Sequence, residues 1–282
     1  MRQIISALLG AIALSIACVP GVLAANMPMK APVAAPYNNW TGFYVGLNAG
    51  GGWGHSNDPT SATFNPTTGY FSAAGTTAVN SAGAQSTNTS GFTGGLQAGY
   101  NWQWANIVAG IEADFDYFGQ KGSSSTSGVY SGFTSSSFTI NSSVSTNWLF
   151  TARPRLGMVV ANNWLFYGTG GLAVTQVKAN WSFTDNCNIG VVCTVLAFAP
   201  PTSASTSASA TKAGWVVGGG VESALPGKLS LGVEYLYVNF GSISATNSNF
   251  ISGASGGGLT QAFNHSADLT ANIVRVRLNK QF

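Results

Sequence analysis

The stretch WTGFYVGLNAGGGW, residues 40–53, places Phe43, Val45 and Leu47 on one side of an extended chain and small or polar residues on the other. A two-residue period of this kind predicts a β-strand with one apolar face. The stretch GFTGGLQAGYNWQW repeats the pattern at 91–104. Similar segments lie near 107–118, 147–160, 164–177, 213–224, 229–240 and 268–282. Each of these eight strands reaches the roughly 9–11 residues that a tilted membrane strand needs. In 164–177 the sequence leaves open which parity faces outward.

The connections between these strands alternate strictly in length. Short ones lie around 105–106, 161–163 and 225–227, and long ones rich in Ser, Thr, Asn, Ala and Gly lie at about 54–90, 119–146, 178–212 and 241–267. Tight periplasmic turns and long external loops are typical of outer-membrane barrels. Because hydrocarbon offers backbone groups no partner, the strands must close into a ring. The sequence therefore predicts an all-β fold: an eight-stranded antiparallel transmembrane up-and-down β-barrel with short periplasmic turns and four long external loops.

The composition excludes several other classes of protein. Only 7% of the 282 residues are charged, against about 25% in ordinary soluble domains. The eleven Lys and Arg face eight Asp and Glu without forming a cluster, so no nucleic-acid partner is expected. A hydrophobic share of 45% with eight Trp argues against disorder. Only one apolar stretch approaches the length of a membrane helix, which excludes a helical bundle.

That apolar stretch lies at the N-terminus and follows Arg2. A positive start, an apolar middle and small residues before Ala24 predict a cleaved signal peptide. A retained signal anchor is the alternative, although the Pro-Gly pair at 20–21 interrupts the helix. A lipoprotein attached at Cys18 is a further one, although Ser15 stands where that motif needs Leu. The predicted organisation is a signal peptide (1–24), a proline-rich periplasmic spacer (25–39) and an outer-membrane β-barrel (40–282).

Tryptophans lie at the predicted strand ends. Trp40, Trp102, Trp104 and Trp164 fall at periplasmic ends, and Trp53, Trp148 and Trp215 fall at external ends. Indole prefers the membrane interface, where its ring is half in hydrocarbon and its N–H meets water. The pattern predicts two aromatic girdles; ordinary core aromatics are the alternative.

Charged residues within the predicted strands occupy the parity opposite the apolar face. They are Glu112, Asp114, Asp116, Arg153, Arg155, Glu222, Glu234, Arg275 and Arg277. Charges inside a membrane segment must face a lumen and find partners. Counting from the turns places Glu112 level with Arg155, Asp114 with Arg153, and Glu234 with Arg277. Two interpretations follow: an ion-conducting constriction, or a structural polar core. Because eight strands leave an interior only wide enough for side chains, the second is favoured.

Cys187 and Cys193 share the third long connection. Nearby cysteines in an oxidising compartment usually pair, so a disulfide is predicted, with two free thiols as the alternative. Because neither His55 nor His265 neighbours the cysteines in sequence, no zinc or other metal site is expected.

Two short clusters could be read as catalytic. They are His55 with Ser56 and Asp58, and His265 with Ser266 and Asp268. A nucleophile needs a base that a third group holds in place, and Gly/Ser-rich segments give no sign of one. We therefore predict no catalytic residue and no cofactor.

The chain ends in LNKQF, with Phe282 last. A terminal aromatic on an amphipathic strand resembles the signal read by the barrel assembly machinery, although Lys280 stands where that signal is usually apolar. The motifs WTGFYVGLNAGGGWG (40–54), GGLQAGYNWQW (94–104), GTGGLAV (168–174), GWVVGGGVESAL (214–225), LGVEYLYVNFG (231–241) and NIVRVRLNKQF (272–282) together resemble the alphaproteobacterial small outer-membrane protein family. This is the RopB-type group, often called outer-membrane immunogenic or porin-like proteins.

The resemblance implies an eight-stranded barrel, surface-exposed loops and a role in envelope integrity or host contact. It carries no catalytic residue. Outer-membrane lipid is the expected surrounding partner, and the external loops would meet a host or surface ligand. The predicted function is a non-enzymatic outer-membrane protein that supports the envelope and displays surface loops. The alternatives are a small-solute channel and an adhesin that acts through 54–90 and 178–212.

Overall fold

The computed structural model describes residues 39–67, 69–130, 133–161, 163–186, 202–252 and 259–282. The predicted signal peptide, nearly all of the predicted spacer, and both Cys187 and Cys193 lie outside the described residues. Among the residues described, no helix is both long enough and apolar enough to cross a bilayer.

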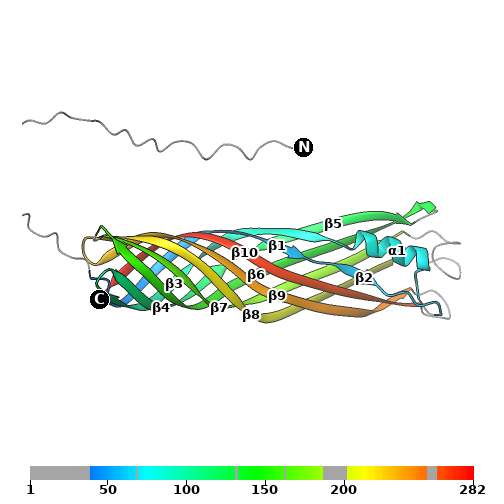
Figure 1. The fold of residues 1–282 in the computed structure, drawn as a ribbon. Helices are drawn as coiled ribbons and strands as arrows, with labels where there is room; N and C mark the ends of the chain where they lie inside the picture. The colour runs from blue at the N-terminus through cyan, green and yellow to red at the C-terminus, as the bar shows by residue number, and fades with distance from the viewer. Residues whose placement is uncertain (1–38, 68, 131–132, 162, 187–201, 253–258) are drawn as a thin grey trace, which may run out of the picture. The chain divides into compact units, whose positions relative to one another are not determined.

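Eight antiparallel strands form a closed ring in the described chain (Figure 1). They are β1 (Gly42–Asn57), β3 (Ser86–Trp104), β4 (Ile107–Phe118), β6 (Phe133–Val160), β7 (Trp164–Asp185), β8 (Thr202–Leu225), β9 (Leu229–Ser252) and β10 (Leu259–Gln281). Each pairs with its neighbours in the order β1-β10-β9-β8-β7-β6-β4-β3, and β1 also pairs with β3. The first and last strands therefore close the ring, and the predicted all-β antiparallel ring of eight is confirmed.

In the half of the ring that carries the short turns, the wall is mainly apolar on the outside and mainly polar on the inside. We call this end the lower end of the barrel. On β1, Leu47 is 56% exposed whereas Asn48 is 6% exposed. The sequence alone does not show which residues of β7 face outward. In the structure Trp164 faces outward and Leu165 is buried, so β7 follows the same alternation. From Phe43 to Trp53, ten residues at about 3.3 Å each and a tilt near 40° give a height of about 25 Å. An apolar band of that height matches a membrane barrel.

The polarity of the two faces reverses at one level of the barrel. On β10, Val274 and residues after it put apolar side chains outside, whereas Ile273 and residues before it put them inside. On β9 the same change falls between Tyr235 and Leu236, which are the register partners of Val274 and Ile273. Below this level the wall suits lipid, and above it the barrel has an ordinary apolar core with a polar exterior. The level therefore marks the external edge of the membrane band.

The strands continue well beyond that edge, so the prediction of four long external loops is wrong for most of those segments. Residues 121–130 form β5 (Lys121–Tyr130), and much of 119–146, 178–212 and 241–267 lies in β6 to β10. The cause is visible in the residues: Ser, Thr and Asn alternate with Ala, Val and Phe, which is strand periodicity with weak contrast. We call this part of the barrel the extension.

The wall of the extension contains one helix. Above the pairing of Ser90 with Lys121, β5 follows β6 and no longer pairs with β3. Helix α1 (Ala73–Ala82) fills the interval between β5 and the short strand β2 (Thr60–Ala62), which pairs with β10 (Figure 1). Ser72 caps its N-terminus by accepting a hydrogen bond from the Gly75 amide, which satisfies a backbone donor.

Candidate functional site: a charged and closed barrel interior

Nine ionisable side chains fill one level of the barrel inside the membrane band, and we call them the charged layer. They are Glu112, Asp114 and Asp116 on β4, Arg153 and Arg155 on β6, Glu222 on β8, Glu234 on β9, and Arg275 and Arg277 on β10. None is more than 5% exposed. The alternation of side chains along each strand places every one of them in the lumen, because each lies at an inward position. All except Glu222, which precedes Ser223, lie between two outward apolar residues.

Each arginine of the charged layer contacts two or three carboxylates. Arg153 lies 2.7 Å from both Glu112 and Asp114 and 3.3 Å from Glu234. Arg275 lies 2.7 Å from Asp116, 3.0 Å from Asp114 and 2.7 Å from Glu234. Planar guanidinium groups suit such multiple pairing, since each carries five donors.

The other two arginines lie among aromatic rings. Arg155 pairs with Glu222 at 2.9 Å and stacks over the Tyr167 ring with its central carbon 4.0 Å from the centroid. Arg277 pairs with Glu234 at 2.7 Å and also contacts Glu112. The Tyr167 hydroxyl donates to Glu234 at 2.9 Å. The layer has five carboxylates and four arginines, and the Tyr167 hydroxyl supplies one further hydrogen-bond donor to a carboxylate.

The pairing of residues across neighbouring strands is shifted by two residues from the pairing predicted by counting from the turns. Arg153 pairs across from Glu112, and Glu234 pairs across from Arg275. The contacts expected from sequence are nevertheless present, at 3.4 Å for Arg155 with Glu112 and 2.7 Å for Arg153 with Asp114. Long arginine side chains bridge the offset that barrel stagger introduces between neighbouring strands.

Apolar layers lie on both sides of the charged layer. Toward the periplasmic turns, Trp40, Val108, Val159, Leu165 and Tyr167 pack together. Toward the extension, a larger cluster forms the middle apolar layer. It includes Phe118, Leu149, Val177, Trp181, Leu236, Phe240, Leu269 and Ile273. Lumen side chains therefore pack against each other at both levels, as an eight-stranded barrel requires.

A polar layer lies above the membrane band, inside the extension. Asp58 accepts hydrogen bonds from Thr87 at 2.9 Å and from Ser142. His265 lies 2.9 Å from Thr60 through Nδ1 and stacks on Trp181. Burial raises the pKa of Asp58 above its ordinary value and lowers the pKa of His265 to about 4. His265 is therefore neutral at physiological pH.

The two clusters that could have been catalytic are separated by the wall. His55 faces outward toward Asn88, whereas Ser56 and Asp58 face inward. His265 faces inward, whereas Asp268 faces the outside and accepts from Asn57. Strand alternation puts consecutive residues on opposite faces, so neither set can converge on one substrate. Within the described ranges no group of three or more His, Cys, Asp or Glu residues is placed to hold a metal ion.

An aromatic cluster closes the far end of the extension, and we call it the aromatic cap. It contains Tyr70, Phe71, Tyr130, Phe138, Phe183 and Phe263, with Val79 of α1. Asp185 accepts hydrogen bonds from the hydroxyls of Tyr70 and Tyr130, each at 2.9 Å. This shared acceptor ties the strand β5, the strand β7 and the segment before α1 together.

Six of the seven predicted girdle tryptophans lie on the outer wall. Trp53, Trp102, Trp104, Trp164 and Trp215 are between 40% and 61% exposed, and Trp148 stacks on the exposed Phe115. Trp40 does not fit the prediction, because it is 5% exposed and packs inside the periplasmic mouth. Its amide donates to Gln103 at 2.8 Å, which turns the chain inward before β1 begins.

The carboxyl-terminal residue lies on the outer surface. Phe282 is 65% exposed, its ring lies 6.2 Å from that of Phe43, and its amide donates to the Phe43 carbonyl at 2.9 Å. Lys280 is exposed on the same strand and donates to the Gly227 carbonyl at 2.6 Å in the β8–β9 turn. A lysine is therefore accommodated at the position where the assembly signal is usually apolar.

A closed antiparallel ring with an apolar outer band, aromatic residues at its edges and a paired polar lumen defines an integral outer-membrane β-barrel protein. A family model for the outer membrane protein beta-barrel domain matches residues 14–263, and the chain belongs to that family. The match confirms the resemblance found in the motifs and the outer-membrane location.

Two relatives come from alphaproteobacteria. The 31 kDa outer-membrane immunogenic protein of Brucella melitensis is 34% identical over 215 residues, which cover 75% of this chain and 77% of that protein. The 22 kDa outer membrane protein of Rhizobium leguminosarum is 30% identical over 171 residues, covering 61% and 63%. Among solved structures, OprG from Pseudomonas aeruginosa aligns over 87% of this chain and 99% of that chain, at 10% identity and a TM-score of 0.42.

Proposed function

We propose that this protein is a non-enzymatic structural barrel of the outer membrane, closed to solutes, which holds a rigid β extension above the bilayer. The observation that carries the proposal is the filling of the lumen at successive levels. The charged layer, the middle apolar layer and the aromatic cap each bring side chains from several strands into contact. An ion crossing the barrel would have to displace buried Arg–carboxylate pairs and then a hydrocarbon layer.

Single-channel recording in planar bilayers tests this function. The refolded barrel is expected to give no stepwise current above that of a protein-free membrane. The channel alternative predicts stable conductance steps whose cation selectivity falls in Asp116→Asn, because that carboxylate belongs to the charged layer. Steps of that kind would refute the closed barrel.

The adhesin alternative needs a test suited to the extension. Because most of 178–212 is barrel wall, deleting the whole segment would break the fold. Deleting only residues 187–201, between β7 and β8, and inserting Gly-Gly in their place keeps both strands, because Asp185 and Thr202 are register partners and need a loop of at least two residues. An envelope role predicts that detergent resistance of the cells and surface binding are unchanged by this deletion. Loss of surface binding with an intact envelope would favour the adhesin.

A further inference from the structure

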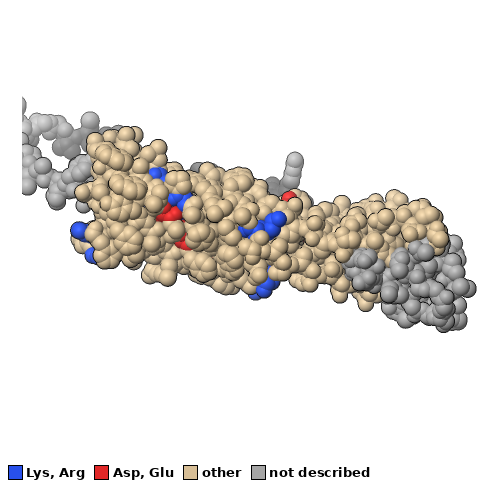
Figure 2. Space-filling view, turned by 90° about the horizontal axis from the view of Figure 1, so that it is seen from below, with Lys and Arg blue, Asp and Glu red and all other residues tan. Residues whose placement is uncertain are grey.

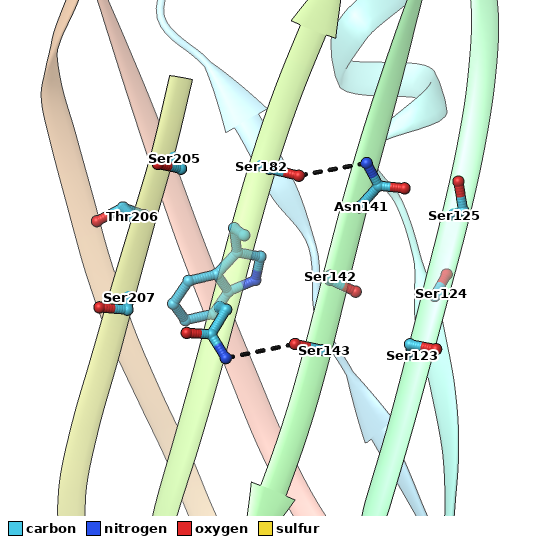
Figure 3. A pocket seen from close by; sticks show the side chains of 12 residues that line it. Ser123, Ser124, Ser125, Asn141, Ser142, Ser143, Ser182, Ser205, Thr206 and Ser207 are labelled. Atoms are coloured by element: carbon cyan, nitrogen blue, oxygen red, sulfur yellow. Dashed lines mark hydrogen bonds between the residues drawn. The ribbon is translucent and has the colours of Figure 1, made fainter. Parts of the chain in front are cut away.

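The outer face of the extension carries a polar groove on β5, β6, β7 and β8. Its volume is about 670 Å³, and Figure 3 shows the side chains that line it. They are Ser123, Ser124, Ser125, Asn141, Ser142, Ser143, Asn180, Trp181, Ser182, Ser205, Thr206 and Ser207. All belong to four adjacent strands and none to the opposite wall, and the hollow lies on the outside of the barrel. Asn141, Ser143, Asn180 and Ser182 face outward, whereas the side chains of Ser142 and Trp181 face the lumen.

Eleven of the twelve lining residues carry a hydroxyl or amide group, and the twelfth is Trp181. The outward residues on its central strand, Asn141 and Ser143, are half-buried although they face away from the lumen. Asn141 donates to Ser182 at 3.2 Å, and Asn180 donates to Ser143 at 3.4 Å (Figure 3). These bonds fix the amides and leave further donors and acceptors for a ligand. A surface of this kind suits a polyhydroxylated molecule, because each ligand hydroxyl can both donate and accept.

Two lysines lie at the membrane end of the groove. Lys121 and Lys178 are the outward residues that precede Ser123 on β5 and Asn180 on β7, and both are exposed. Both pair in register with Ser145 of β6. Two strand spacings therefore separate their backbones, which is about 10 Å. Their flexible side chains can converge on one anionic group above Ser145.

The face around these lysines lacks opposing charge. The acids of β5 to β8 are Asp185 and Glu222, and both point into the barrel. Figure 2 shows one face of the molecule, on which most of the surface is uncharged and a few blue and red groups are scattered. Lys121 and Lys178 are thus not neutralised by neighbouring carboxylates on this face.

The height of the lysines places them at the lipid headgroups. The exposed Tyr117 marks the external girdle on β4, and Lys121 follows four residues later along the same side of the barrel. Four residues at about 3.3 Å and a tilt near 40° give about 10 Å of height. The polar headgroup zone of a bilayer begins within this interval. The groove continues upward from there.

We propose that this groove binds the headgroup of an anionic glycolipid of the outer leaflet, namely lipopolysaccharide. Lys121 and Lys178 pair with its membrane-proximal phosphate or carboxylate, and the hydroxyl and amide groups of β5 to β8 hold the sugars above it. This site goes beyond the proposed structural function, because a barrel closed to solutes does not require it. Stepwise conductance would refute the closed barrel but would not bear on lipid binding by the groove, because the groove lies on the outer face.

The test measures binding of labelled lipopolysaccharide to the refolded barrel in neutral micelles, with Lys121→Gln/Lys178→Gln as the variant and Lys228→Gln/Lys280→Gln as the matched control. The first variant is expected to bind about thirtyfold more weakly, the loss expected for two positive charges at a membrane surface. The control pair removes the same charge from the periplasmic end and is expected to bind normally. Equal losses in the two variants would overturn the site.

A second variant tests the sugar contacts separately. Ser143→Leu fills the groove with an apolar side chain and leaves both lysines in place. It is expected to weaken binding of lipopolysaccharide at least fivefold and to leave binding of phosphatidylglycerol, an anionic lipid without sugars, unchanged. If wild-type protein binds the two lipids equally, or if Ser143→Leu has no effect, the saccharide site is refuted. Because all substituted side chains lie on the outer face, heat-modifiable migration on gels checks that each variant is folded.

Discussion

Replacing Arg275 with methionine should destabilise the barrel strongly, because it leaves one carboxylate with no cation. Of the three carboxylates that Arg275 contacts, Asp114 keeps Arg153 at 2.7 Å, and Glu234 keeps Arg153 and Arg277. Asp116 keeps only a hydrogen bond from Asn48, at 2.9 Å. Removing one partner of a buried pair typically costs about 3–5 kcal/mol. We expect a loss of that size in Arg275→Met.

Urea unfolding in lipid vesicles, followed by tryptophan fluorescence, measures this loss. The double variant Arg275→Met/Asp116→Asn removes the stranded charge together with its partner. It should regain at least half of the lost free energy, because replacing a whole buried pair is often close to neutral. Thr211→Ala, on the exposed face of β8, should stay within about 0.5 kcal/mol of wild type. A single variant that loses under about 1 kcal/mol, or a double variant no better than the single, would refute a dry paired lumen.

Three further predictions use the same unfolding assay. Burial holds the pKa of His265 at about 4, so the unfolded chain takes up a proton first as the pH falls from about 6.5; stability should drop between pH 6.5 and 4, and His265→Leu should flatten that slope. In Gly220→Ala the new Cβ would lie 2.6 Å from the Tyr167 hydroxyl, so a loss of about 1–3 kcal/mol is expected from overpacking, and wild-type stability would contradict it. Trp40→Ala should cost about 3 kcal/mol or more, whereas Trp104→Ala, at 61% exposure, should cost less; equal losses would place Trp40 in the girdle instead.

The membrane half of the fold could be predicted from the sequence because its two faces differ sharply in polarity. In 272–282, valine and leucine alternate with arginine, and this contrast marks both the strand and its lumen side. The charged layer followed from the same parity. Its register did not, because counting from separate turns assumes that neighbouring strands are level, whereas barrel strands are staggered.

The sequence does not predict the extension, because the alternation in these segments has little polarity contrast. On β8, outward Ser205, Ser207 and Ser209 alternate with inward Ala208 and Ala210. Serine and alanine both have low strand propensity, and serine-rich runs are typical of loops. The signal that could have revealed these strands is the period of two itself. On β6 it was stronger, since Phe138, Ile140 and Val144 recur at even positions among serines and threonines.

The buried position of Trp40 differs from the predicted girdle for a related reason. A tryptophan at a strand end is expected at the membrane interface only if it belongs to the strand and occupies one of its outward positions. Trp40 precedes β1, which begins at Gly42. Its backbone bond to Gln103 directs it under the barrel, where it covers the lumen.

The reversal of polarity at the membrane edge explains why one chain needs two kinds of core. Between the periplasmic apolar layer and the external edge of the membrane band, burial of apolar side chains in the lumen would gain nothing over lipid contact, so ion pairs and hydrogen bonds specify the packing there. Above the bilayer, water surrounds the wall and the hydrophobic effect acts in its ordinary direction. The middle apolar layer, with Leu236 and Ile273 fully buried, begins at the external edge of the membrane band. Continuous strands join the two regimes, so the polar face that carries Lys121 and Lys178 is held at a fixed height above the lipid. A flexible loop in the same place could not keep two lysines level with the headgroups.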